Sequence, residues 1–93
     1  MPKTLPGALG YRYFRKVTVD IGSIAAGEVE DETVTVKGLR KSAPVHVEFP
    51  NLNAGLVPCN EHCSAADTLK FRVYNDTGGA VNPASQEIWV TQF

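Results

Sequence analysis

The chain has 93 residues, of which 43% are hydrophobic and 20% are charged, and its formal net charge is −1. This length fits one domain with one core, because folding at this size removes only roughly 60 to 65% of the unfolded chain's surface from water. The composition is that of a globular protein and excludes the disordered, collagen-like and membrane classes. The apolar runs fall far short of the roughly 20 residues that span a bilayer, and residues 1–10 lack the apolar region of a signal peptide. We therefore expect a soluble domain that is made and kept in a cytoplasm.

The first strands in chain order are predicted from short stretches in which apolar and polar residues alternate. A long strand, or two joined by a bend, is expected over 11–21, where the odd positions are apolar from Val17 onward. The small residues of 22–28 predict a turn, and the acids at 28, 30, 31 and 32 are interpreted as a solvated hairpin end. The β-branched run 33–37 predicts the second strand. A basic turn over 38–43 then leads to a third strand over 45–49.

The second half of the chain gives the clearest strand pattern. Pro50 removes a ladder donor, so we expect a turn over 51–55 and then only a brief strand over 56–58. Leu69, Phe71 and Val73 alternate with Lys70, Arg72 and Tyr74, and the residues NDTGG (75–79), which accept a positive φ, end this strand. In the last strand, over 87–93, Ile88, Trp89 and Val90 are consecutive, which predicts a strand covered on both faces or one at a subunit contact.

Six or seven short strands without a crossover helix predict an all-β fold. The expected architecture is a small antiparallel β-sandwich, Ig-like or jelly-roll-like, with a small barrel as the alternative. Residues 1–10, with two prolines and two glycines, are expected to form an extended N-terminal arm, and 11–93 a single β-sandwich domain. The aromatic residues assigned to the core are Phe14, Phe49, Phe71, Trp89 and Phe93. The alternative is a ligand face on which Tyr11, Tyr13, Tyr74 and Trp89 stack against a sugar.

Charged residues are placed unevenly, although a sum of −1 predicts neither nucleic-acid nor membrane binding. Blocks of one sign alternate along the chain: first the basic Lys3, Arg12, Arg15 and Lys16, then the acidic Asp20, Glu28, Glu30, Asp31 and Glu32, then the basic Lys37, Arg40 and Lys41. Opposite patches favour docking to a polar partner, and the basic residues are the candidate docking residues. The alternative is a set of solvated loop charges, screened within about 8 Å at physiological salt.

The segment CNEHC (59–63) is the one cluster of potential metal or redox residues. A structural zinc site needs four ligands, and the second ligand pair is missing unless His46 is recruited by the fold. Cys59 and Cys63 could instead form a local disulfide once a particle has left the cell, or remain free thiols in a turn. Catalysis is not expected, because His62 and Cys63 are adjacent and face apart on an extended chain. No cofactor or metal is predicted.

The stretch from Val17 to Val90 resembles a family of short structural proteins of tailed bacteriophages and sandwich modules of larger virion proteins. The resemblance rests on the order and spacing of IGSIAAGE before a TVTV strand, LNAGLV, SAADTLKFRVYN and TGGAVNPAS. It implies a decoration or cement protein on a capsid's outer surface, or a small part of a tail appendage. The chain departs from the family at CNEHC, so any role of its cysteines is particular to this chain. Asp67, before the strand at Leu69, is interpreted as a structural Asx-turn residue.

The first functional hypothesis is a non-enzymatic capsid decoration protein that docks through its arm and basic stretches and stabilises the head by bridging capsomers. Its expected partner is the major capsid protein, and its location is the virion surface after assembly in the host cytoplasm. Self-association as a trimer or other homo-oligomer is a further expectation, with Trp89 and Phe93 as the candidate self-contact. The alternatives are a tail or fibre component that binds a receptor or glycan, a host-type carbohydrate-binding or adhesion module, and a cysteine enzyme or zinc module.

Overall fold

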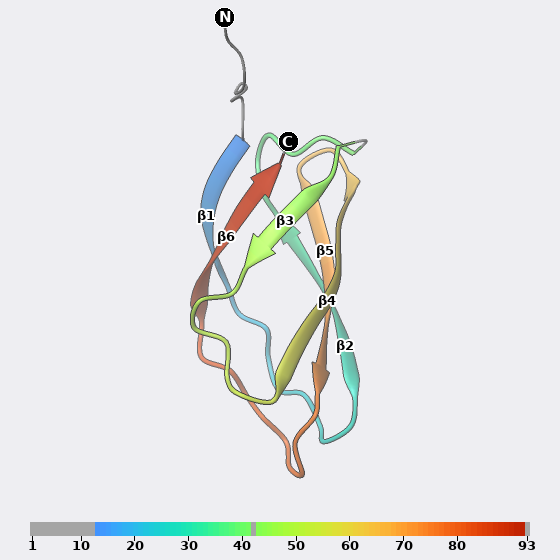
Figure 1. Cartoon of the computed structure of the whole chain (residues 1–93), viewed down its shortest axis with the longest axis vertical. Coiled ribbons are helices and arrows are strands. Elements are labelled where there is room, and N and C mark those ends of the chain that lie inside the picture. The colour runs from blue at the N-terminus through green and yellow to red at the C-terminus, as the bar shows by residue number, and fades with distance from the viewer. Residues whose placement is uncertain (1–12, 42, 93) are drawn as a thin grey trace, which may run out of the picture.

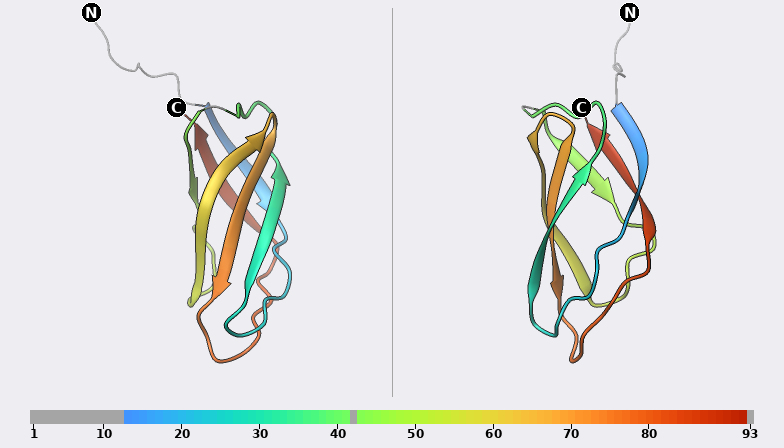
Figure 2. Two further views of the ribbon diagram at one scale, coloured as in Figure 1. Left: turned by 90° about the vertical axis from the view of Figure 1, so that its right-hand side faces the viewer. Right: turned by 180° about the vertical axis from the view of Figure 1, so that it is seen from behind.

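The computed structural model describes residues 13–41 and 43–92. Within this part of the chain the strands are β1 (Tyr13–Val19), β2 (Val29–Thr35), β3 (Val45–Glu48), β4 (Leu56–Ala65), β5 (Thr68–Asn75) and β6 (Gln86–Gln92). They form two three-stranded antiparallel sheets, ordered β1-β6-β3 and β2-β5-β4, which pack face to face (Figures 1 and 2). The predicted antiparallel β-sandwich is confirmed. The arm predicted over 1–10 lies outside the described residues.

The core lies between the two sheets and is supplied by the inward positions of the strands and by buried residues of the connections that flank β2. Phe71 is 1% exposed at its centre and meets Phe49 edge to face, with ring centroids 5.2 Å apart. The next inward-facing residues of β5, Leu69 and Val73, are fully buried. The other buried apolar residues are Val19, Ile21, Ile24, Val36, Leu39, Val47, Leu56, Cys63, Ile88 and Val90. The prediction that β5 is amphipathic and carries Phe71 into the core is therefore confirmed.

Two aromatic residues assigned to the core lie outside it. Phe14 is 51% exposed and Trp89 is 39% exposed. Ile88 and Val90 are both fully buried, so strand alternation turns Trp89 between them to the opposite, outer face. The interpretation of 88–90 as a strand that this chain covers on both faces was therefore wrong. Phe93 lies outside the described residues.

Strands β2 and β4 are longer than their alternation predicts. β2 begins at Val29, so the acids at 30, 31 and 32 lie within a strand and not at a hairpin end. β4 continues through CNEHC, where the register against β5 shifts between Cys59 and His62. Asn60, within this irregularity, has a φ of 57°. A β-bulge of this kind inserts extra residues without ending the pairing, so the segment is strand and not turn.

Asn75 closes the loop between β5 and β6 from a fully buried position. Its Nδ2 donates to the carbonyls of Ile24 (2.8 Å) and Gly79 (2.9 Å), and its Oδ1 accepts from the backbone N–H (3.0 Å) and hydroxyl (2.6 Å) of Thr77. One amide thus joins this loop to the β1–β2 connection, where Ile24 also pairs with Val81. β5 ends at Asn75 as predicted, but none of residues 75–79 has a positive φ, so the loop is shaped by the hydrogen bonds of Asn75 and not by left-handed glycines. Among the described residues, no helix has the length and apolar character to cross a membrane.

Candidate functional site

Four of the five described basic residues of the two predicted docking stretches lie at one end of the sandwich, which we call the basic end and define by Arg15, Lys37, Arg40 and Lys41; the fifth, Lys16, lies on an outer face. The β2–β3 loop that carries the last three lies beside the start of β1 (Figure 1). The Tyr13 hydroxyl donates to the Lys37 carbonyl, and the Arg15 guanidinium lies 5.6 Å from the centroid of the Tyr13 ring. Stretches more than twenty residues apart in sequence therefore meet there. Lys3 and Arg12 lie outside the described residues.

The loop of the basic end is held by side chains from both sheets. Gln92, 1% exposed on β6, accepts from the Arg40 N–H at 2.9 Å and donates to the carbonyls of Arg40 (2.7 Å) and Ala43 (3.1 Å). Asp67 in the β4–β5 turn accepts from the Gly38 N–H at 2.7 Å. Asp67 is thus structural as predicted, but it caps a neighbouring loop and not its own turn. These bonds fix the backbone while the side chains at 37, 40 and 41 remain exposed.

Gly38 is required where this loop passes β1. Its φ is +97°, and a Cβ added there would lie 2.6 Å from the Tyr13 ring. A side chain at this position would therefore be both strained and in collision with the aromatic ring. The close approach keeps the loop of the basic end against the first residue of β1.

The outer face of sheet β1-β6-β3 carries exposed aromatic side chains beside charged ones; we call it the aromatic face and define it by Phe14, Lys16, Trp89, His46 and Glu48. The register places Lys16 and Glu48 on either side of Trp89, in one row across the sheet. The Lys16 ammonium lies 5.5 Å from the Trp89 ring centroid, a cation–π contact. His46 Nε2 and Glu48 Oε2 lie 2.5 Å apart. This row joins a predicted docking residue, Lys16, to the predicted self-contact, Trp89.

Strand β2 carries the acidic residues and forms one edge of its sheet. Glu30 and Glu32 pair with the buried Val73 and Phe71, so both lie on the core side of this edge strand. Partial burial is the main cause that raises the pKa of Glu32 above its ordinary value of 4.5, and repulsion from Glu30, Asp20 and Asp31 adds to the effect. Inward-pointing charges of this kind prevent an open strand from pairing with another sheet.

Glu32→Gln is expected to raise the melting temperature at pH 7. Because the folded pKa of Glu32 is raised, folding favours its protonated form, and its ionisation destabilises the fold as the pH rises through that pKa. The gain in melting temperature from Glu32→Gln should therefore be largest at neutral pH. It should shrink toward zero near and below about pH 4.5, the ordinary pKa of a glutamate. Calorimetry at pH 7 and near pH 4.5 measures the melting temperatures of the variant and of the wild type. Glu87→Gln, which removes a carboxylate from the outer face of β6, is the control, and an equal gain from both variants would contradict the assignment.

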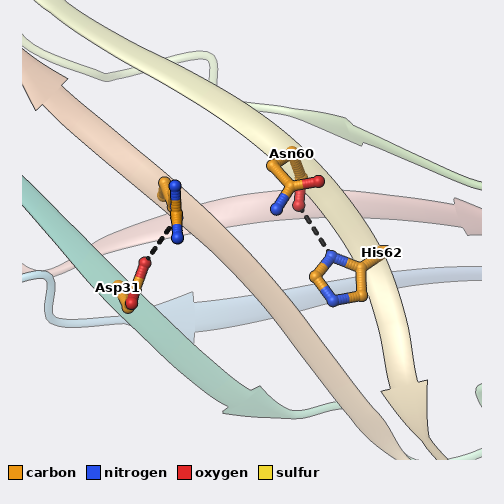
Figure 3. Close-up of polar contacts among 4 residues, drawn as sticks. Asp31, Asn60 and His62 are labelled. Atoms are coloured by element: carbon orange, nitrogen blue, oxygen red, sulfur yellow. Dashed lines mark hydrogen bonds and ion pairs between the residues drawn. The ribbon is translucent and has the colours of Figure 1, made fainter.

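A shallow groove of about 190 Å³ opens on the outer face of sheet β2-β5-β4, and its lining residues are Asp31, Asn60, His62, Lys70, Phe71 and Arg72. We call it the β4 groove. Arg72 Nε donates to Asp31 Oδ1 at 2.9 Å, and His62 Nδ1 donates to the Asn60 carbonyl at 2.8 Å (Figure 3). The sequence prediction missed this site, although the alternation of Lys70 and Arg72 around the buried Phe71 indicates that both face outward.

The structure does not form the disulfide considered for Cys59 and Cys63, since both thiols are free. The two residues lie in the same strand, where each residue advances the chain by about 3.3 Å. Four such steps exceed the Cα separation of roughly 7 Å that a disulfide tolerates, even when a bulge shortens them. Cys59 is exposed, whereas Cys63 is buried and donates to the Ala65 carbonyl at 2.9 Å. Within residues 13–41 and 43–92, no three His, Cys, Asp or Glu side chains are grouped to hold a metal ion.

Comparison with protein-family models, with curated proteins and with solved structures gives no match. The basic end, the aromatic face and the β4 groove are the candidate functional surfaces of the described residues.

Proposed function

We propose that the protein is a non-enzymatic structural protein of a bacteriophage particle, a decoration or cement protein that binds the outer surface of the head. Its partner would be the major capsid protein, and it would stabilise the capsid by bridging neighbouring capsomers after assembly in the host cytoplasm. The resemblance of residues 17–90 to phage structural proteins supports the assignment to a phage particle. The charged surface of the sandwich supports binding to another protein of that particle.

The observation that carries the proposal is the convergence of four of the predicted docking residues at the basic end. Lys37, Arg40 and Lys41 lie on the β2–β3 loop, whose backbone Gln92 and Asp67 hold, and Arg15 lies beside it on β1, which pairs with β6. A cluster of positive charges on a loop whose backbone is held attracts an acidic surface and favours one orientation in which the two proteins meet. Many copies, each bound weakly to the repeating capsid lattice, would together form a stable shell.

The direct test mixes the purified protein with phage particles that lack it, sediments them, and counts the copies bound to heads and to isolated tails. Saturable binding to heads, with copies in proportion to the capsid lattice, is the expected result. Binding to neither heads nor tails would reject the proposal. Heads carrying the protein should also resist heat or chelators at levels that disrupt bare heads.

The double variant Lys37→Ser, Lys41→Ser is expected to weaken binding to heads by about tenfold at low salt, because rim charges control association and its salt dependence. The difference from wild type should shrink as salt is raised. The control is Asn53→Asp, Asn82→Asp, which lowers the net charge equally at two exposed positions in other loops. If both double variants lost affinity alike, net charge alone would be responsible and the basic end would not be the docking site.

A second candidate function is favoured by the aromatic face. Phe14 and Trp89 are exposed on one outer face, where Lys16 lies two residues from Phe14 on β1 and opposite Trp89 on β6. Aromatic rings with polar neighbours are typical of receptor- and glycan-binding surfaces. Binding to isolated tails, or to glycans with loss on Trp89→Ala, would favour a tail or fibre component. The predicted self-contact at Trp89 is tested in the same samples, since Trp89→Ala would then lower the oligomer mass in sedimentation.

A further inference from the structure

The β4 groove lies across three strands on the face opposite the aromatic face. The register pairs Asp31 of β2 with Arg72 of β5, and Lys70 of β5 with His62 of β4. Side chains directly opposite each other on one face of an antiparallel pair have Cβ atoms about 5 Å apart. A guanidinium, an ammonium and an imidazole therefore surround one hollow, which Phe71 also lines although its side chain is buried in the core.

Several donors in this groove have no partner in the described part of the chain. The one ion pair of Arg72 uses its Nε, which leaves both terminal nitrogens. The Lys70 ammonium takes part in none of the hydrogen bonds or ion pairs, and His62 uses only Nδ1. With Lys70 and Arg72 against Asp31, the groove carries one net positive charge when His62 is neutral.

The β-bulge shapes this site. Asn60 has a φ of 57°, a left-handed conformation that costs a non-glycine residue energy, and its carbonyl holds the His62 ring at 2.8 Å. Bulges recur where a strand must re-aim a side chain, and here the shift in register falls between Cys59 and His62. The geometry therefore directs His62 to the groove and fixes which ring nitrogen donates.

We propose that the β4 groove binds a carboxylate on a partner protein, the side chain of a glutamate or aspartate. Its volume of about 190 Å³ is below the range of roughly 300 to 1,000 Å³ typical of small-molecule sites, and suits one side chain. Guanidinium and ammonium donors match a carboxylate through charge-assisted hydrogen bonds. Asp31 on the wall disfavours a doubly charged phosphate more than a singly charged carboxylate. This site goes beyond the proposed docking by the basic end and needs no capsid to be tested.

The experiment is a titration of the ¹⁵N-labelled protein followed by NMR. The probe is a glutamate capped at both ends, the matched control is capped glutamine, and inorganic phosphate is the third arm. Saturable shifts in the amides of 59–62 and 70–72 and in the Arg72 Nε–H signal, seen with capped glutamate and not with capped glutamine, are expected. No saturation by capped glutamate, or saturation by phosphate alone, would overturn the proposal.

Three variants assign the response to the groove. Lys70→Gln should weaken binding of capped glutamate by roughly tenfold, as loss of a charged hydrogen bond does, whereas Lys16→Gln on the aromatic face should leave it unchanged. Asp31→Asn should tighten binding several-fold, since it removes the built-in competitor for Arg72. Equal affinity in wild type and Lys70→Gln, or weaker binding in Asp31→Asn, would contradict the site. Amide spectra of each variant show whether the fold is intact.

Discussion

Phe71→Ala is expected to lower the free energy of unfolding by about 3 to 5 kcal/mol, the sum of lost transfer free energy and the cavity left behind. Phe71 is 1% exposed between two fully buried neighbours on β5, the central strand of its sheet, and its ring packs edge to face on Phe49. The ring belongs to the core between the two sheets, so its removal leaves a cavity there. For a domain of this size the loss is a large part of the total stability.

The measurement for Phe71→Ala is urea unfolding with the slope and midpoint fitted together. Phe14→Ala is the matched control, because the same atoms are removed from a side chain that is 51% exposed. That variant should lose less than about 1 kcal/mol. If the unfolding midpoint of Phe71→Ala barely moved, the placement of this ring in the core would be wrong.

Asn75→Ala is expected to cost about 2 to 3 kcal/mol, although it removes few atoms. The carbonyls of Ile24 and Gly79 would each lose one of two donors, keeping the Val81 N–H and the Thr77 hydroxyl, and the Thr77 N–H would lose its acceptor. Each hydrogen bond lost costs about 0.5 to 1.5 kcal/mol. The loss should be accompanied by faster amide exchange at Thr77 and in the adjacent connection, which hydrogen exchange measures.

Asn82→Ala, at an exposed position in the same loop, serves as the control for Asn75→Ala. It should change the free energy of unfolding by no more than about 0.5 kcal/mol. A similar small change for Asn75→Ala would show that water replaces its amide and that the hydrogen bonds described above add little to stability.

The strand pattern could be predicted where alternation reports burial on one face. Leu69, Phe71 and Val73 are apolar at every second position, and their strand appears where it was predicted. Glu30 and Glu32 are polar at core-side positions, so alternation does not predict their strand. Such residues are tolerated there because an edge strand leaves its core-side positions partly in water. At Asn60 a bulge interrupts the period, so a continuous strand resembles a turn in the sequence.

The candidate sites could be predicted only in part, since they depend on pairing between distant strands. The basic residues were identified by their charge, but the meeting of Arg15 with the loop at 37–41 follows from Tyr13 and Gln92, which tie β1 and β6 to that loop. The β4 groove depends on the register of Lys70 with His62 across a bulge. No local pattern encodes that register, because the extra residues of a bulge change which side chains face each other.

The position of β6 has a consequence for how the protein forms during synthesis. β6 is the last of the described strands, yet it lies at the centre of its sheet and pairs with both β1 and β3. Neither of those strands has a partner in that sheet until β6 has left the ribosome, whereas the β4–β5 hairpin can pair earlier from neighbouring residues. Contacts between such distant parts of a chain form slowly. A nascent chain stalled before Gln86 would therefore expose two unpaired strands, and would be a target for chaperones or proteases.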